Sequence, residues 1–200
     1  MYASKILLFV AAAVSASPLG SFVPRYSNST SDSHHLVARA APKFYSGPHT
    51  SFPAKATWKD FNTLWAANVP SMKAKGDHQS DVDRIKTALQ SVGPKYGIEP
   101  RVLLCIMMQE SHGDVGAFTT TSKPDNLQTG GLFQCYNCPG FYRQYGLSQS
   151  QITSMVEGGA KHFKGDLDQF GGAWSPSADA PNATPAYVSD ISQRLGGWVD

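Results

Sequence analysis

The segment from Pro100 to Ser111 is the part of the sequence that most limits how this chain can fold. Pro100 suits the first position of a helix, the residues that follow it are almost all apolar, and Gly113 ends the run. A helix that is apolar on every side has to be buried, because no face of it is suited to water. We therefore predict a buried helix over residues 100–111.

Other stretches repeat apolar residues at helical spacing. One helix is expected to begin at Thr57, as its cap, and to end at Pro70, and the next is stopped by Gly93 and Pro94. The four further predicted helices cover residues 57–70, 80–92, 152–170 and 184–198. Strand signals are sparse and residues 114–130 have the composition of a loop, so the predicted class is a mainly α single domain.

Residues 1–17 have the layout of a secretory signal peptide. An apolar run at 6–14 follows an early lysine, and the small residues after it suit cleavage near Ala16 or Ser17. The run is too short to span a bilayer, and no later stretch is apolar for long enough to do so. We expect a secreted, extracellular protein that is not held in a membrane.

Residues 18–42 contain few large apolar side chains and show no sustained periodicity. Such a stretch buries too little surface to offset the entropy of ordering it, which predicts a disordered leader or pro-segment. The folded domain is expected over residues 43–200. N-glycosylation sequons begin at Asn28 in the leader and at Asn182 beside the last predicted helix.

The charge of the chain is close to balanced. The formal net charge is +2, and removing Lys5 with the signal peptide leaves +1, so there is no strong field to attract nucleic acid or an anionic membrane. Lone histidines without metal-ligand spacing stand at positions 78, 112 and 162. We expect no nucleic-acid partner, no metal, no cofactor and, by default, a monomer.

The chain has three cysteines: Cys105, Cys135 and Cys138. In an oxidising compartment this number predicts one disulfide and one remaining thiol. Cys135 and Cys138 could form a local bridge, or either could reach Cys105. Cys105 lies in the apolar helix and could equally be a buried free thiol.

Glu110 is the candidate for chemistry, because it stands near the C-terminal end of the buried helix. Apolar neighbours and the negative end of the helix dipole both disfavour the ionised carboxylate, so they raise its pKa. A carboxyl group that keeps its proton near neutral pH can act as a general acid. The simpler alternative is a helix-terminal glutamate that points into solvent or pairs with a lysine or arginine.

Three motifs together resemble one enzyme family. Residues 109–111 (Gln-Glu-Ser) end a helix, 131–134 (Gly-Leu-Phe-Gln) follow a loop, and 184–191 close the domain. This arrangement is similar to the Glu-Ser and Gly-Leu-Met-Gln motifs and the closing segment of soluble lytic transglycosylases and goose-type lysozymes. The resemblance covers residues 80–198, and the whole chain looks like the secreted lysozyme-like proteins of fungi.

The resemblance implies a lysozyme-like fold with Glu110 as the catalytic acid. It also implies that Ser111, Gly131, Gln134 and Tyr187 line the sugar-binding cleft. Each has a plainer alternative: the serine helps to end the helix, the glutamine hydrogen-bonds a loop, and the tyrosine is one more core aromatic. The family's Ala-Tyr-Asn-x-Gly motif has no clear counterpart, the nearest stretch being residues 172–175, and the loop after Glu110 is longer than in the bacterial enzymes.

The implied activity is cleavage of the β-1,4 bond between N-acetylmuramic acid and N-acetylglucosamine in peptidoglycan. In a lytic transglycosylase the substrate's own groups supply the second step, whereas a hydrolase needs a second carboxylate to position water. Asp114 and Asp125 are the candidates for that carboxylate. A non-catalytic protein of the same fold that binds a glycan or a host protein is the alternative function.

Overall fold

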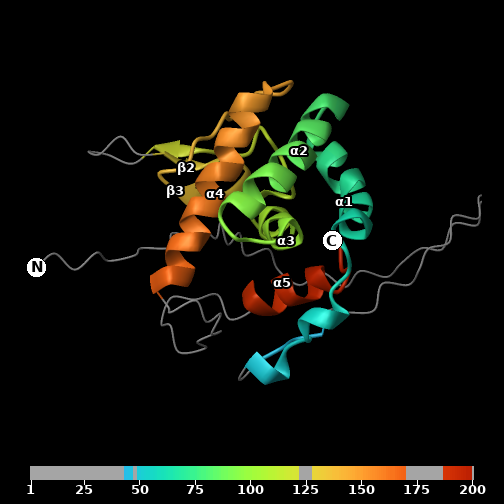
Figure 1. Cartoon of the computed structure of the whole chain (residues 1–200). Helices are drawn as coiled ribbons and strands as arrows, with labels where there is room; N and C mark the ends of the chain where they lie inside the picture. The colour runs from blue at the N-terminus through green and yellow to red at the C-terminus, as the bar shows by residue number, and fades with distance from the viewer. Residues whose placement is uncertain (1–42, 47–48, 122–127, 170–186, 200) are drawn as a thin grey trace, which may run out of the picture. The chain divides into compact units, whose positions relative to one another are not determined.

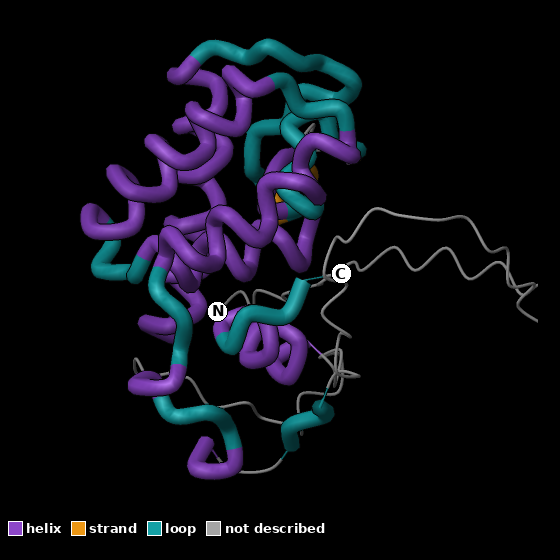
Figure 2. Tube along the Cα trace, turned by 90° about the vertical axis from the view of Figure 1, so that its right-hand side faces the viewer, coloured by secondary structure: helices purple, strands orange, loops and turns teal. Residues whose placement is uncertain are grey.

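The structure is a computed structural model that describes residues 43–46, 49–121, 128–169 and 187–199, all within the unit Ala41–Asp200 (Figure 1). The predicted signal peptide, the predicted leader and both sequons lie outside these residues. The described chain is mainly helical, as predicted, with short strands and three single-turn 3-10 helices: η1 (His49–Ser51), η2 (Lys55–Thr57) and η3 (Gly131–Phe133) (Figure 2). No helix among the described residues is both long and apolar enough to cross a membrane.

Helix α3 (Pro100–Ser111) matches the predicted buried helix at both ends. Leu103, Leu104, Met107 and Met108 are fully buried in it. The helix packs against α1, α2, α5 and η3, and Figure 1 shows it almost end-on with other helices around it. Helix α3 therefore forms the centre of the core, and its C-terminal end is held by the elements around it.

Helix α1 (Phe61–Lys75) differs from the prediction at both ends. Asp60, not Thr57, caps it, since its carboxylate accepts a hydrogen bond from the backbone N–H of Thr63 at 3.0 Å. Pro70 lies inside the helix and does not end it. A proline removes one helical hydrogen bond, but Met72 beyond it is fully buried, and that burial favours continuing the helix.

Helix α2 (Gln79–Lys95) begins one residue before the predicted start and continues past Gly93 and Pro94. Its buried face carries Val82, Ile85, Leu89 and Val92 at helical spacing, and it packs against α4. A side chain at Gly93 would meet the carbonyl oxygen of Ile98 at 2.7 Å. The glycine thus allows a close approach between the end of α2 and the chain leading into α3, and it does not stop the helix.

Helices α4 (Gln149–Gln169) and α5 (Tyr187–Leu195) follow the predicted periodicity. The buried face of α4 includes Ile152, Met155 and Val156. The predicted start of the last helix at residues 184–186 lies outside the described residues. The last helix ends at Leu195 and not at residue 198 as predicted. Two glycines follow Leu195, and the backbone N–H of Trp198 bonds back to the carbonyl of Gln193 at 3.0 Å.

A small antiparallel sheet has its first two strands in the region 114–130, which was predicted to be a loop. Its strands are β1 (Thr120–Thr121), β2 (Gln128–Gly130) and β3 (Cys135–Tyr136), in the order β1-β2-β3. Strands of two or three residues are too short to show an alternating pattern, which is why the sequence does not reveal them. The sheet and η3 lie next to α4, and η3 also contacts α3.

Candidate active site

Glu110 lies near the end of α3, where two residues in the left-handed conformation turn the chain away. His112 has φ 55° and Gly113 has φ 76°. The Glu110 side chain is partly buried, and this burial raises the pKa of its carboxyl above the ordinary value. The direction agrees with the expectation from the sequence, with loss of hydration as the main cause.

Tyr187 at the start of α5 is brought to Glu110, as the resemblance implies. Its hydroxyl donates a hydrogen bond to the Glu110 carboxylate, which lowers the pKa of Glu110 and opposes the effect of burial. Burial and the nearby Glu110 charge both raise the pKa of Tyr187 well above its ordinary range. Tyr187 therefore stays protonated as a hydrogen-bond donor to Glu110.

Gln109, the residue before Glu110, fastens α3 to α5. Its side-chain amide donates to the Asp190 carboxylate at 3.3 Å and accepts from the Nε of Arg194 at 2.9 Å. Arg194 is only 2% exposed, and its guanidinium lies 4.6 Å from the centre of the Trp198 ring. These contacts hold α5 in register with α3, which positions Tyr187.

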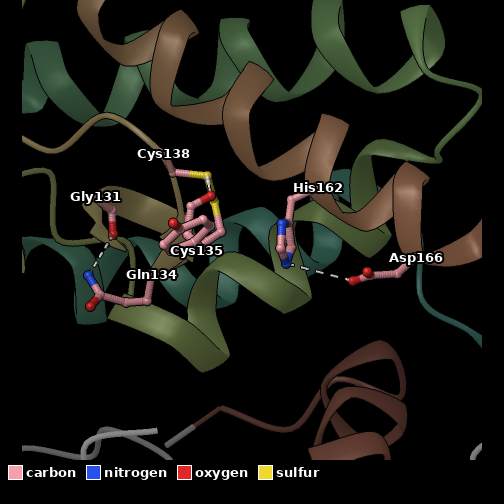
Figure 3. The surroundings of a disulfide bond; sticks show 7 residues. Gly131, Gln134, Cys135, Cys138, His162 and Asp166 are labelled. Carbon is pink, nitrogen blue, oxygen red and sulfur yellow. Dashed lines mark hydrogen bonds and ion pairs between the residues drawn. A yellow bond between two sulfur atoms is a disulfide. The ribbon is translucent and has the colours of Figure 1, made fainter. Parts of the chain in front are cut away.

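His162 and Asp166 on α4 belong to the same neighbourhood. Their Nε2 and Oδ2 atoms lie 3.8 Å apart, at the i,i+4 spacing that places two side chains on one helix face (Figure 3). The charge of protonated His162 lowers the pKa of Glu110, and the charge of Asp166 raises the pKa of Tyr187. Sequence reasoning treated His162 as a lone histidine; its spacing from Asp166 was the signal that could have identified the pair.

Ser111 has a structural role in the described chain. Its hydroxyl lies 2.8 Å from the carbonyl oxygen of Leu132, to which it donates, and it accepts from the backbone N–H of Gly113 at 3.2 Å. The side chain therefore ties the end of α3 to η3. This contact fits the plainer alternative for Ser111 and also places the 131–134 motif beside Glu110.

Gly131 and Gln134 shape the same turn. Gly131 has φ 65°, and a side chain there would meet the carbonyl oxygen of Pro139 at 2.3 Å. The Gln134 side-chain amide donates to the carbonyl of Gly131 at 2.8 Å (Figure 3). It also donates to the carbonyl of Phe118 at 3.0 Å. Both residues thus stabilise loops. The absence of a side chain at Gly131 lets the backbone of Pro139 approach it closely.

The disulfide joins Cys135 and Cys138, whose Cα atoms are 5.4 Å apart (Figure 3). Cys105 is the buried free thiol, and burial raises its pKa to about 12. The local bridge is therefore the pairing that forms among the alternatives. It closes the turn directly after Gln134, beside α4.

Asp114, a candidate second carboxylate, belongs to a separate acidic cluster. Its carboxylate accepts from the backbone N–H of Gly116 at 2.8 Å, and its neighbours are Lys75 and the Tyr145 hydroxyl. Its charge also acts on buried Asp77. Asp114 is not among the groups that shift the pKa of Glu110, whereas His162 in its protonated form is. The other candidate, Asp125, lies outside the described residues, as do residues 172–175.

Two open hollows lie near this region, and Glu110 lines neither. One of about 350 Å³ is mostly apolar and includes the Tyr187 side chain; its other members include Trp58, Val102, Ile106, Phe163 and Leu167. The other, of about 430 Å³, lies over the small sheet and is lined by Thr121, Gln128, Asn137, Cys138 and Pro139. Among the described residues, no group of three or more His, Cys, Asp or Glu side chains is arranged to hold a metal ion.

Comparisons of the chain with protein-family models, with curated proteins and with solved structures found no match.

Proposed function

We propose that the protein is a secreted glycoside-cleaving enzyme with a lysozyme-like fold. Its substrate is the β-1,4 bond between N-acetylmuramic acid and N-acetylglucosamine in peptidoglycan. The observation that carries the proposal is the contact between Glu110, at the end of the central helix, and Tyr187, at the start of α5. The substrate class is taken from the resemblance that the three sequence motifs carry. The contact between Glu110 and Tyr187 joins the first of these motifs to the last.

Glu110 is the general acid. Burial favours its protonated form, so the carboxyl can donate a proton to the glycosidic oxygen as the bond from the sugar C1 to that oxygen breaks. The Tyr187 hydrogen bond and the His162 charge favour the ionised form that remains after the transfer. These opposing influences suit a group that gives up a proton in one step and takes one back in the next.

In the second step one of two nucleophiles attacks C1. Each loses its own proton as it attacks, either to Glu110 or to another base. In the transglycosylase route the 6-hydroxyl of N-acetylmuramic acid attacks C1, and Glu110 accepts its proton. In the muramidase route water attacks from the opposite face with the help of a second carboxylate. Asp114 is not among the groups that shift the pKa of Glu110, and Asp125 lies outside the described residues, so the proposal takes the route that needs Glu110 alone.

Release of soluble fragments from purified peptidoglycan tests the proposal. Wild type should release fragments and Glu110→Gln should not, because an amide has no proton of suitable acidity to give. Glu157→Gln is the matched control, since Glu157 lies on the outer part of α4 in an ion pair with Lys95. Equal release by wild type and Glu110→Gln would refute the role of Glu110. Absence of release by either, with binding retained, would favour the non-catalytic glycan-binding protein.

A further inference from the structure

Two exposed aromatic rings stand together on loops after α3 and after β3. The Phe118 side chain is 59% exposed and Tyr142 is 42% exposed. Their ring centres are 5.2 Å apart, with one ring edge-on to the face of the other. The guanidinium of Arg143 lies 5.0 Å from the centre of the Tyr142 ring. We call Phe118, Tyr142 and Arg143 the aromatic platform.

The backbone beneath the aromatic platform is held in place. The N–H of Arg143 donates to the carbonyl of Gly116 at 2.9 Å, which joins the two loops. Tyr145 packs so closely on Gly116 that a side chain there would meet its ring at 2.9 Å. Large apolar groups that are fixed in the folded state and still exposed to water mark interaction surfaces, because a ligand can bind them at little cost in conformational entropy.

The aromatic platform is connected to the end of α3 by a short series of hydrogen bonds. The carbonyl of Phe118 accepts from the Gln134 side chain at 3.0 Å. Two residues earlier, the carbonyl of Leu132 accepts from the hydroxyl of Ser111 at 2.8 Å. Ser111 directly follows Glu110. These bonds tie the loop that carries Phe118 to the end of α3 that carries Glu110.

We propose that Phe118, Tyr142 and Arg143 bind a stretch of the peptidoglycan glycan chain beyond the bond that is cleaved. A pyranose ring has an apolar face of C–H groups, which packs on the electron-rich face of an aromatic ring. N-acetylmuramic acid and its peptide also carry carboxylates, which the Arg143 guanidinium can pair with. The choice of glycan rests on the proposed function, whereas the binding surface can be tested without cleavage.

Binding to insoluble peptidoglycan tests the inference in a Glu110→Gln background, where the ligand stays intact. Phe118→Ala and Tyr142→Ala should each weaken binding about three- to tenfold, the loss expected for one aromatic contact. Tyr136→Ala is the matched control, because Tyr136 is 51% exposed on β3 and is outside the aromatic platform. Thermal unfolding of each variant shows whether the fold is retained.

Arg143→Gln tests the charge. It should weaken binding to peptidoglycan and leave binding to chitin, which lacks carboxylates, unchanged. The inference is overturned if Phe118→Ala and Tyr142→Ala bind peptidoglycan as Tyr136→Ala does, or if the Glu110→Gln protein does not bind peptidoglycan at all. Loss of binding in the platform variants of a protein that never cleaves would refute the proposed function and support the inference. Glu110-dependent cleavage together with unchanged peptidoglycan binding by the platform variants would support the proposed function and refute the inference.

Discussion

The hydroxyl of Tyr187 donates a hydrogen bond to the carboxylate of Glu110, and this bond joins the first residues of α5 to the last turn of α3. It lowers the pKa of Glu110 while burial raises it. Burial is the larger effect, so the pKa of Glu110 stays above its ordinary value. This hydroxyl therefore narrows the pH range in which Glu110 keeps its proton, although burial has the larger effect.

Replacing Tyr187 with Phe should extend activity to higher pH. Without the hydrogen bond the pKa of Glu110 rises further, and a general acid is lost only when the pH passes its pKa. A hydrogen bond to a charged group is stronger than one between neutral groups, so the alkaline limb of the pH profile should move measurably upward. The measurement is kcat/KM for peptidoglycan as a function of pH. Tyr96→Phe, on the chain between α2 and α3, should leave the profile as in wild type, and a downward shift in Tyr187→Phe would contradict this account.

Asp77→Asn should stabilise the protein at pH 8. Asp77 and Asp81 are both buried, and each has one carboxylate oxygen with no hydrogen-bond partner among the described residues. Burial, together with the charges of Asp114 and Asp81, raises the pKa of Asp77 from 3.8 to about 7. Asparagine keeps the acceptor for the N–H of Val115, which lies 3.1 Å from Asp77 Oδ1, and removes the charge.

The pH dependence follows from that raised pKa. A carboxyl whose pKa is raised by folding contributes its full stability below the unfolded value near 3.8 and loses it as the pH rises to about 7. The shift corresponds to about 4 kcal/mol as an upper bound. Thermal unfolding of both proteins should give similar melting temperatures at pH 4 and a higher one for Asp77→Asn at pH 8. A variant that is less stable at both pH values would show that the ionised form is the one the fold favours.

Gly131→Ala should destabilise the fold by roughly 2–4 kcal/mol. The added Cβ would lie 2.3 Å from the carbonyl of Pro139, and the positive φ at this position disfavours any side chain. Gly165→Ala on α4 is the control: nothing lies within 4 Å of a Cβ there, so the better helix former should stabilise by up to about 1 kcal/mol. Urea unfolding measures both changes. Equal stability of Gly131→Ala and wild type would mean that the turn can relax.

The sequence predicts the features that depend on burial and helical period. Helix α3 is found at its predicted bounds because a run with no polar face has no stable place except the core. The raised pKa of Glu110 follows from the same burial. The pairing of Glu110 with Tyr187 was implied by the resemblance alone, since no local pattern reports which side chains meet across helices.

Features that depend on tertiary contacts were missed. Pro70 stays inside α1 because burial beyond it outweighs one lost hydrogen bond, and a local stop signal carries no information on that burial. The ion pair of His162 with Asp166 affects Glu110 only because α3 and α4 lie close together in the fold. Gln134, expected to face the sugar, donates to two backbone carbonyls of loops that the sequence does not place together.

The masses of the fragments that the protein releases from purified peptidoglycan test the central claim most directly, with Glu110→Gln run beside wild type. The account predicts anhydro-N-acetylmuramic ends, one water lighter than reducing ends, from wild type and none from Glu110→Gln. Reducing ends that are lost in Glu110→Gln would keep Glu110 as the acid and require a second carboxylate. Fragments that Glu110→Gln releases as wild type does would contradict the account.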